Sequence, residues 1–240
     1  PAVALFFLIV ISSLSPFIYS HQDETASPLQ LENNIPARAG ASGDPGVSDV
    51  PVWRIGDKWI YSGTFAPTAL IVNSGVSASV GEINGDTTAE VISISEQSVD
   101  NMTVLAYTLR SYANFDKSGI ELDGYTGNAF IEYTQTEILQ VSDLSIIRSD
   151  LEMYIQFVPY GISSLTRILG DITISNTYSP VNEVYDFPLR ADERWTTTKT
   201  TSSTWSGTSD YITPFPPPVT DTNSTTWEVT AVGKPFNSRG

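Results

Sequence analysis

The chain has 240 residues, of which 40% are hydrophobic and 11% aromatic, so it can form one domain with a real core. Its 27 acidic and 12 basic residues give a net charge of −15. This charge argues against nucleic acid and anionic lipid headgroups as partners, because both require a basic surface. The lack of cysteine excludes disulfides, thiol catalysis and cysteine-based zinc sites.

Residues 1–20 have the pattern of a secretory signal helix. Residues 2–14 form an apolar run without a charge, and the small residue Ser20 precedes a polar switch at His21. The run is shorter than the roughly twenty residues that a stable membrane span needs. No initiator Met or basic segment precedes it, so we expect the amino end to be clipped. We therefore expect an exported protein, secreted or at the cell surface, that meets a membrane only through this segment.

Residues 21–50 are expected to form a flexible acidic linker. They are rich in Asp, Glu, Ser, Pro, Gly, Asn and Ala and carry few large apolar side chains, so ordering them would bury too little surface. The only histidine of the chain, His21, begins this segment, which leaves no residue for Ser-His-Asp chemistry.

Residues 51–240 are expected to form one mainly β domain, because hydrophobicity alternates with period two. Charged residues are only 16%, as is typical of extracellular β proteins with Ser and Thr on their solvent faces. We expect a curved antiparallel sheet resembling a half-barrel, with a two-sheet sandwich as the alternative. Strands are predicted at 53–61, 88–95, 102–112, 129–139, 151–158, 172–178, 194–204 and 225–232.

Turn residues separate the predicted strands. Asn84-Gly85 is the strongest hairpin signal, because a type I′ turn requires positive φ at both central residues, and Asp100-Asn101 and Asp123-Gly124 are further signals. Residues 163–169 could form one or two helical turns. Two stretches, 176–192 and 207–221, look irregular, and prolines within the second predict a loop between strands.

Two motifs carry a family resemblance. The first is Trp-x-x-Gly-Asp-x-Trp-x-Tyr at residues 53–61, and the second is Phe-Pro-Leu followed by Trp at residues 187–195. Their order resembles uncharacterised exported β domains of archaea and bacteria, and more loosely the lipoprotein-carrier half-barrels. In that pattern a Gly usually precedes the second Trp, whereas Arg194 stands here. The resemblance implies export and a concave apolar sheet face, transfers no catalytic residue, and leads us to expect a further strand or domain beyond Gly240.

Few residues carry candidate chemistry. Asp57 is expected to accept backbone N–H groups in its turn rather than to bind a ligand. Tryptophans 59 and 195 are expected in the core, whereas Trp205, in a Ser/Thr-rich strand, could stack on a sugar. Two sequons predict possible N-glycosylation at Asn101 and Asn223.

We therefore expect a non-enzymatic exported β domain with a binding or structural role, without a cofactor or metal. One form of this hypothesis places an apolar ligand or lipid on the concave face of the sheet. The alternatives are a surface-layer or adhesin-type module that binds glycan or protein, and an accessory domain of a larger secreted hydrolase. Pairs of carboxylates such as Asp192 and Glu193 are too common in an acidic chain to indicate glycoside hydrolysis.

Overall fold

The computed structural model describes residues 47–65, 78–79, 83–210, 214–215 and 217–229. The expected signal helix and most of the expected linker lie outside these residues. The described elements are β1 (Val47–Ser48), β2 (Lys58–Phe65), β3 (Ala78–Ser79), β4 (Ile83–Val99), β5 (Met102–Leu122), β6 (Tyr125–Gln140), β7 (Ile146–Pro159), a 3₁₀ turn η1 (Ser163–Leu165), β8 (Arg167–Asn182), β9 (Leu189–Arg190), β10 (Arg194–Thr208) and β11 (Val219–Glu228). Among the described residues, no helix is long and apolar enough to cross a membrane.

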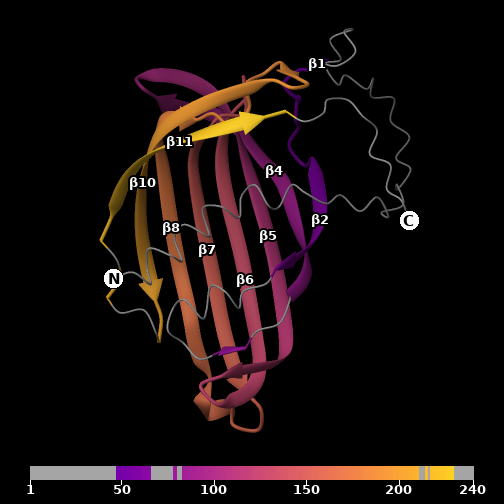
Figure 1. Cartoon of the computed structure of the whole chain (residues 1–240), viewed down its shortest axis with the longest axis vertical. Helices are drawn as coiled ribbons and strands as arrows, with labels where there is room; N and C mark the ends of the chain where they lie inside the picture. The colour runs from indigo at the N-terminus through magenta and orange to yellow at the C-terminus, as the bar shows by residue number, and fades with distance from the viewer. Residues whose placement is uncertain (1–46, 66–77, 80–82, 211–213, 216, 230–240) are drawn as a thin grey trace, which may run out of the picture.

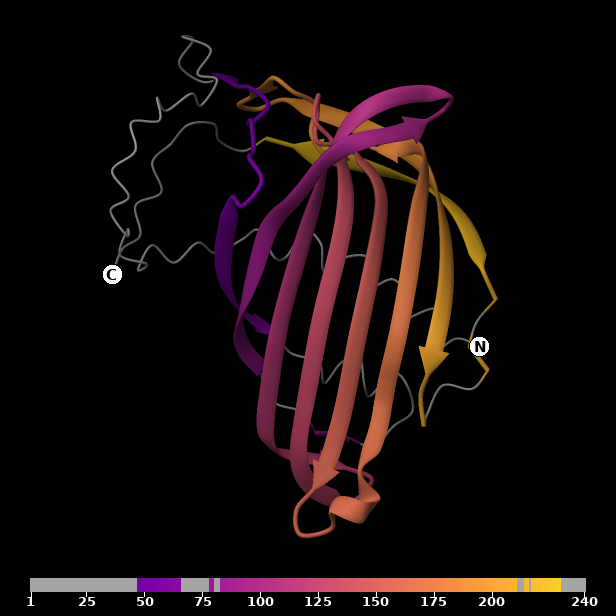
Figure 2. The ribbon, with the colours of Figure 1, turned by 180° about the vertical axis from the view of Figure 1, so that it is seen from behind.

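One large antiparallel sheet dominates the structure. Its strand order is β11-β10-β8-β7-β6-β5-β4-β2, and β3 pairs with β5. Figure 1 shows β4 to β8 side by side as long strands, while β10 and β11 curve across one end. Figure 2 shows the same strands from behind, with β11 on the far side. The sheet is not closed in the described part of the chain, so the expectation of a curved open sheet is confirmed, and the sandwich alternative is not what these residues form.

Tight turns explain why consecutive strands pair. Asp100 and Asn101, with φ of 49° and 64°, join β4 to β5, and Asp123 and Gly124, with φ of 51° and 81°, join β5 to β6. Asn, Asp and Gly tolerate this left-handed region better than other residues, and it matches the twist of a two-residue hairpin. Both predicted turns are confirmed.

The strongest predicted hairpin, Asn84-Gly85, is wrong. Both residues lie inside β4, where Asn84 pairs with Thr64 and Gly85 pairs with Gly63. A Cβ at Gly85 would lie 2.1 Å from the ring of Phe115, so the ring covers the glycine. Glycine is present here because an aromatic ring approaches the backbone closely, not because the chain turns.

Several predicted strand limits also change. The segment at residues 53–57 is a turn before β2, which begins at Lys58. β8 continues to Asn182, into a stretch expected to be irregular, and β11 begins at Val219, six residues before the predicted strand. The short β1, within the expected linker range, pairs with β9. The expected helical turn is η1, and the expected proline-containing loop lies between β10 and β11.

The inner face is the face of the sheet over which β10 and β11 curve, and it carries three apolar clusters. The first lies near the end where β10 bends and includes Val91, Tyr107 and Leu109, with Trp53 and Trp59 packed against them. The second includes Ile120 and Phe157. The third contains Leu151, Ile172 and Ile174, against which Trp205 and Phe215 pack. These clusters supply the main stabilising burial of the described domain.

The opposite, outer face of β10 and β11 carries hydroxyl groups in facing pairs. Thr198 bonds Ser224 at 2.7 Å and Thr200 bonds Thr222 at 2.8 Å, and further pairs follow at Thr196–Thr226 and Ser202–Thr220. Residues directly opposite in an antiparallel ladder share a face, so alternate Ser and Thr in both strands meet in rows. Exposed threonine therefore stabilises this end of the sheet without apolar burial.

Candidate functional site

A row of polar side chains crosses the inner face between the apolar clusters. On β6, the positions that face inward are Ala129, Ile131, Tyr133, Gln135, Glu137 and Leu139, because side chains alternate along a strand. Apolar residues occupy both ends of this series and polar residues the middle. Glu137 is only 5% exposed, and Ser149 of β7 lies directly opposite it. The site therefore begins with a buried carboxylate in a mostly apolar surface.

Hydrogen bonds connect the members of the row. The phenol of Tyr133 donates to the Gln135 Oε1 atom. The Gln135 Nε2 atom donates to the Glu137 Oε1 atom at 3.0 Å and lies 3.1 Å from the Ser149 Oγ atom. The Ser149 hydroxyl also bonds to Tyr178 of β8. We call these five residues the polar row. Its bonds compensate for the loss of hydration of groups that burial removes from water.

The polar row changes the acid–base behaviour of its two phenols. Burial raises the pKa of Tyr133 and of Tyr178 well above that of a free tyrosine, and the negative charge of Glu137 raises both further. The Ser149 hydroxyl acts in the opposite direction on the pKa of Tyr178. Both phenols therefore stay protonated at neutral pH and remain hydrogen-bond donors.

A lysine lies beside one end of the polar row. The Lys199 Nζ atom of β10 donates to the Asn182 Oδ1 atom at 2.6 Å and lies 5.2 Å from the centre of the Tyr178 ring. Burial lowers the pKa of Lys199, because desolvation penalises the charged ammonium form. The inner face thus brings both a carboxylate and an amine close to Tyr178.

The sequence predicted none of these residues as a site. The sequence nevertheless contains an indication of the site. Gln135 and Glu137 lie on the same face of their strand as the apolar residues Ala129, Ile131 and Leu139. Polar residues at core parity indicate a buried polar group. The partners on β7, β8 and β10 come together only through strand register, which no local pattern specifies.

The structure places Trp205 on the inner face. It lies opposite Ile174 in the ladder and packs against the cluster of Leu151, Ile172 and Ile174. It is half-buried, and Tyr133 of the polar row packs against the same cluster. Its predicted role in stacking on a ligand remains a prediction.

The two predicted glycosylation sites are both exposed. Asn101 lies at the tip of the hairpin between β4 and β5, whereas Asn223 lies in the middle of β11. Neither side chain makes a hydrogen bond to another residue that the structure describes. The structure does not bring these two residues together, and modification of each remains a prediction.

Asp57 acts within its turn. Its Oδ2 atom accepts the backbone N–H of Arg54 at 2.7 Å, as the sequence predicts. Trp59 packs against the first apolar cluster and is a core residue. Trp195 is half-buried, and its indole N–H is buried without a hydrogen-bond partner among the described residues.

The chemistry that the polar row offers is recognition of a polar group next to apolar surface. It combines one carboxylate, two protonated phenols, an amide and a hydroxyl. Within the described residues, no group of three or more His, Cys, Asp or Glu side chains is arranged to hold a metal ion. Comparison with family models, curated proteins and solved structures gives no match.

Proposed function

We propose that this chain is a non-enzymatic, exported β domain that holds an amphiphilic ligand on the inner face of its curved sheet. The ligand would lay an apolar chain against the apolar clusters and place a polar head at the polar row. This proposal extends the resemblance to lipoprotein-carrier half-barrels, whose concave face is apolar. The single observation that carries it is the buried, hydrogen-bonded polar row within an otherwise apolar inner face.

The position of Glu137 supports the proposal energetically. Removing an ionised carboxylate from water costs several kcal/mol, and replacing such groups by apolar residues is often neutral or stabilising. Burial alone therefore does not explain why β6 carries Glu137 and Gln135 at two core positions. Ligand sites, by contrast, combine apolar walls with a few polar groups that orient the ligand.

The charge of the row indicates the type of head group. A carboxylate accepts hydrogen bonds and attracts a cation, whereas it repels another carboxylate. The polar head is therefore expected to carry N–H or O–H donors, or a positive charge. A fatty acid or another anionic amphiphile is a poor fit.

Solvent extraction of the secreted protein tests the proposal. The chain would be secreted, purified without detergent and extracted with organic solvent, and the extract would be analysed by mass spectrometry. We expect a stoichiometric amphiphile with an amine, amide or hydroxyl head. An extract indistinguishable from that of an unrelated secreted protein, together with no uptake of a hydrophobic dye, would reject the proposal.

The glycan-binding alternative rests on Trp205. Its packing against Leu151 and Ile174 favours a structural role for this ring, which is why we prefer the inner-face ligand. The hydrolase-accessory alternative predicts no particular feature of the described residues.

A further inference from the structure

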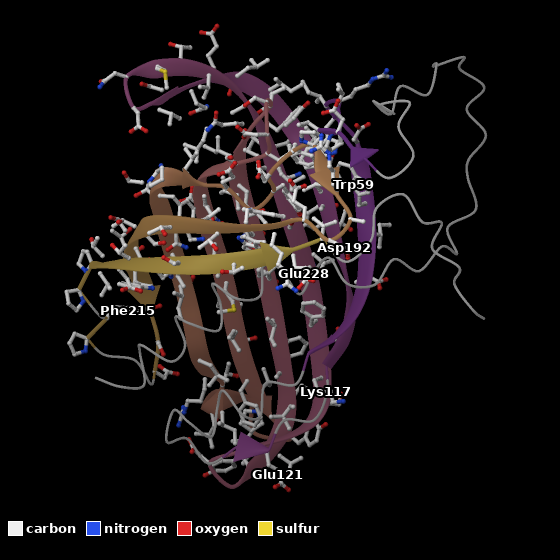
Figure 3. All side chains as sticks on the ribbon, turned by 45° about the horizontal axis from the view of Figure 1, so that its top comes forward. Trp59, Lys117, Glu121, Asp192, Phe215 and Glu228 are labelled. Carbon is white, nitrogen blue, oxygen red and sulfur yellow. The ribbon has the colours of Figure 1, made fainter. Side chains whose placement is uncertain are left out.

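The strand β11 forms one rim of the open sheet. Among the described residues it pairs only with β10, through ten consecutive residue pairs without a register shift. In Figure 3, Glu228 marks the last residue of this strand, and Phe215 lies in the segment that precedes it. In an antiparallel ladder every second residue directs its N–H and C=O groups away from the single partner. β11 therefore presents a long row of backbone groups that another strand could pair with.

The usual guards against edge pairing are missing from the centre of β11. Natural edge strands carry Lys, Pro, a bulge or an inward charge that prevents a second chain from adding. Charged residues stand only near the two ends of the strand, at Asp221 and Glu228, whereas residues 222–227 contain no charged residue and no proline, and the ladder is regular. A strand of this length and regularity needs some other protection in a protein that stays monomeric.

Asn223 lies in the middle of this unprotected stretch. It begins the sequon Asn223-Ser224-Thr225 and is exposed. Its ladder partner is Lys199, whose amine is already bonded to Asn182. Opposite residues of a ladder share a face, so the Asn223 side chain lies on the inner-face side of the rim, as Lys199 does. It is exposed and makes no hydrogen bond to another described residue, so a transferase can reach it at the rim.

We propose that Asn223 is N-glycosylated and that its glycan protects the β11 edge from pairing with a second chain; this inference rests on the export assumed in the proposed function. In the transfer step, the Asn223 Nδ2 atom bonds to the anomeric carbon of an oligosaccharide carried on a polyprenyl phosphate. The bond between that carbon and the phosphate oxygen breaks, the phosphate leaves with the electron pair, and the amide loses one proton to the transferase.

A glycan at this position blocks the edge by volume and by hydration. A strand that adds to β11 would lie about 5 Å from it. The Asn223 side chain leaves the rim on the inner-face side, so a branched, hydrated oligosaccharide there would cover the inner side of the space that an added strand must enter. Asn101 provides an internal comparison, because its sequon lies at a hairpin tip, where a glycan covers no sheet edge.

Secretion from a host with N-glycosylation tests both parts of the proposal. Peptide mass spectrometry locates the glycans, and analytical ultracentrifugation measures self-association. The variants are N223Q and T225A, which destroy the sequon, and T225S, which preserves it. Asn101→Gln is the control for loss of a glycan elsewhere.

We expect a glycan on Asn223 in the parent and in T225S, and monomers for both. N223Q and T225A should lose it and self-associate about tenfold more tightly or more, whereas Asn101→Gln should stay monomeric. If the variants are poorly secreted, trimming the glycan of the folded parent to a single sugar should produce the same self-association.

An unmodified Asn223 in the secreted, folded parent would overturn the proposal. Monomeric N223Q, or a trimmed parent that stays monomeric, would overturn the protective role. Neither result depends on a bound amphiphile, so failure here and failure of the ligand proposal can be distinguished.

Discussion

Trp53 donates its backbone N–H to the phenol oxygen of Tyr107 at 3.1 Å, and the two rings lie 5.3 Å apart. Tyr107 is 2% exposed and belongs to the first apolar cluster. The ring of Trp59 lies 5.2 Å from that of Trp53. The aromatic motif at the start of the domain is thus attached to β5, and its tryptophans act in packing. The described contacts of this motif are therefore packing contacts.

The contact between Phe115 and Gly85 predicts a destabilising substitution. Gly85→Ala would place a Cβ atom 2.1 Å from the Phe115 ring, so the ring must move. We expect a loss of about 1–3 kcal/mol in the free energy of unfolding, measured with urea. Phe115→Leu in the G85A background should recover part of the loss, because it removes the clash. Additive effects of the two substitutions would contradict this account.

The turn before β2 predicts a smaller effect. Asp57→Ala removes the acceptor for the Arg54 N–H, and we expect it to cost about 1 kcal/mol, measured by urea unfolding. Asp57→Asn keeps an acceptor oxygen and should cost less. Equal losses for both variants would show that the charge, and not the hydrogen bond, stabilises the turn.

The two buried phenols predict a pH dependence. The pKa values of Tyr133 and Tyr178 are higher in the folded state than in the unfolded chain, so above pH about 10 the unfolded chain loses protons first. The folded state then binds more protons, and stability falls as pH rises, by up to about 1.4 kcal/mol per pH unit for each phenol. Urea unfolding between pH 9 and 11 measures this slope.

Each of the variants Tyr133→Phe and Tyr178→Phe removes one ionisable phenol. Each should therefore make the fall in the free energy of unfolding with rising pH less steep, by the contribution of that phenol. Lys199 contributes with the opposite sign, because its pKa is lowered in the folded state. Lys199→Met is therefore the control, and it should make the fall in stability steeper. An unchanged slope in both phenylalanine variants would contradict the buried position of the phenols.

Trp205 predicts a test that separates packing from recognition. The Trp205 ring packs on Leu151, Ile172 and Ile174. We therefore expect Trp205→Ala to lower the free energy of unfolding by about 3 kcal/mol, and Trp205→Phe to lower it much less. Thermal unfolding of the two variants measures the difference. A stable Trp205→Ala variant that loses binding on a glycan array would instead support the stacking role.

The sequence predicted the class of the fold well, because period-two alternation is a local property. Predictions of individual turns and strand limits failed where one sequence pattern had two physical explanations. Asn84-Gly85 has the composition of a hairpin turn. Its glycine instead leaves room for the ring of Phe115, which lies thirty residues further along the chain. The prediction missed the start of β11 because this strand is mostly Thr, Asn and Ser and has no alternation of apolar and polar residues there. Pairs of hydroxyl groups, and not apolar burial, connect it to β10.

The candidate site was less predictable than the fold. Glu137 and Gln135 lie two residues apart on one strand, but Ser149, Tyr178 and Lys199 join them from three other strands. Register brings these residues together, and a bulge between β6 and β7 shifts it near Leu139. A single sequence contains no local signal for either feature.

The most direct test of the inner-face ligand compares two probes of equal chain length, a long-chain alkylammonium ion and the corresponding carboxylate. Titration calorimetry would measure both against the parent protein, Glu137→Gln and Lys199→Met. The account predicts tighter binding of the ammonium probe to the parent, loss of this preference in Glu137→Gln, and its retention in Lys199→Met. Equal binding of both probes to the parent, or an ammonium preference that survives Glu137→Gln, would contradict it.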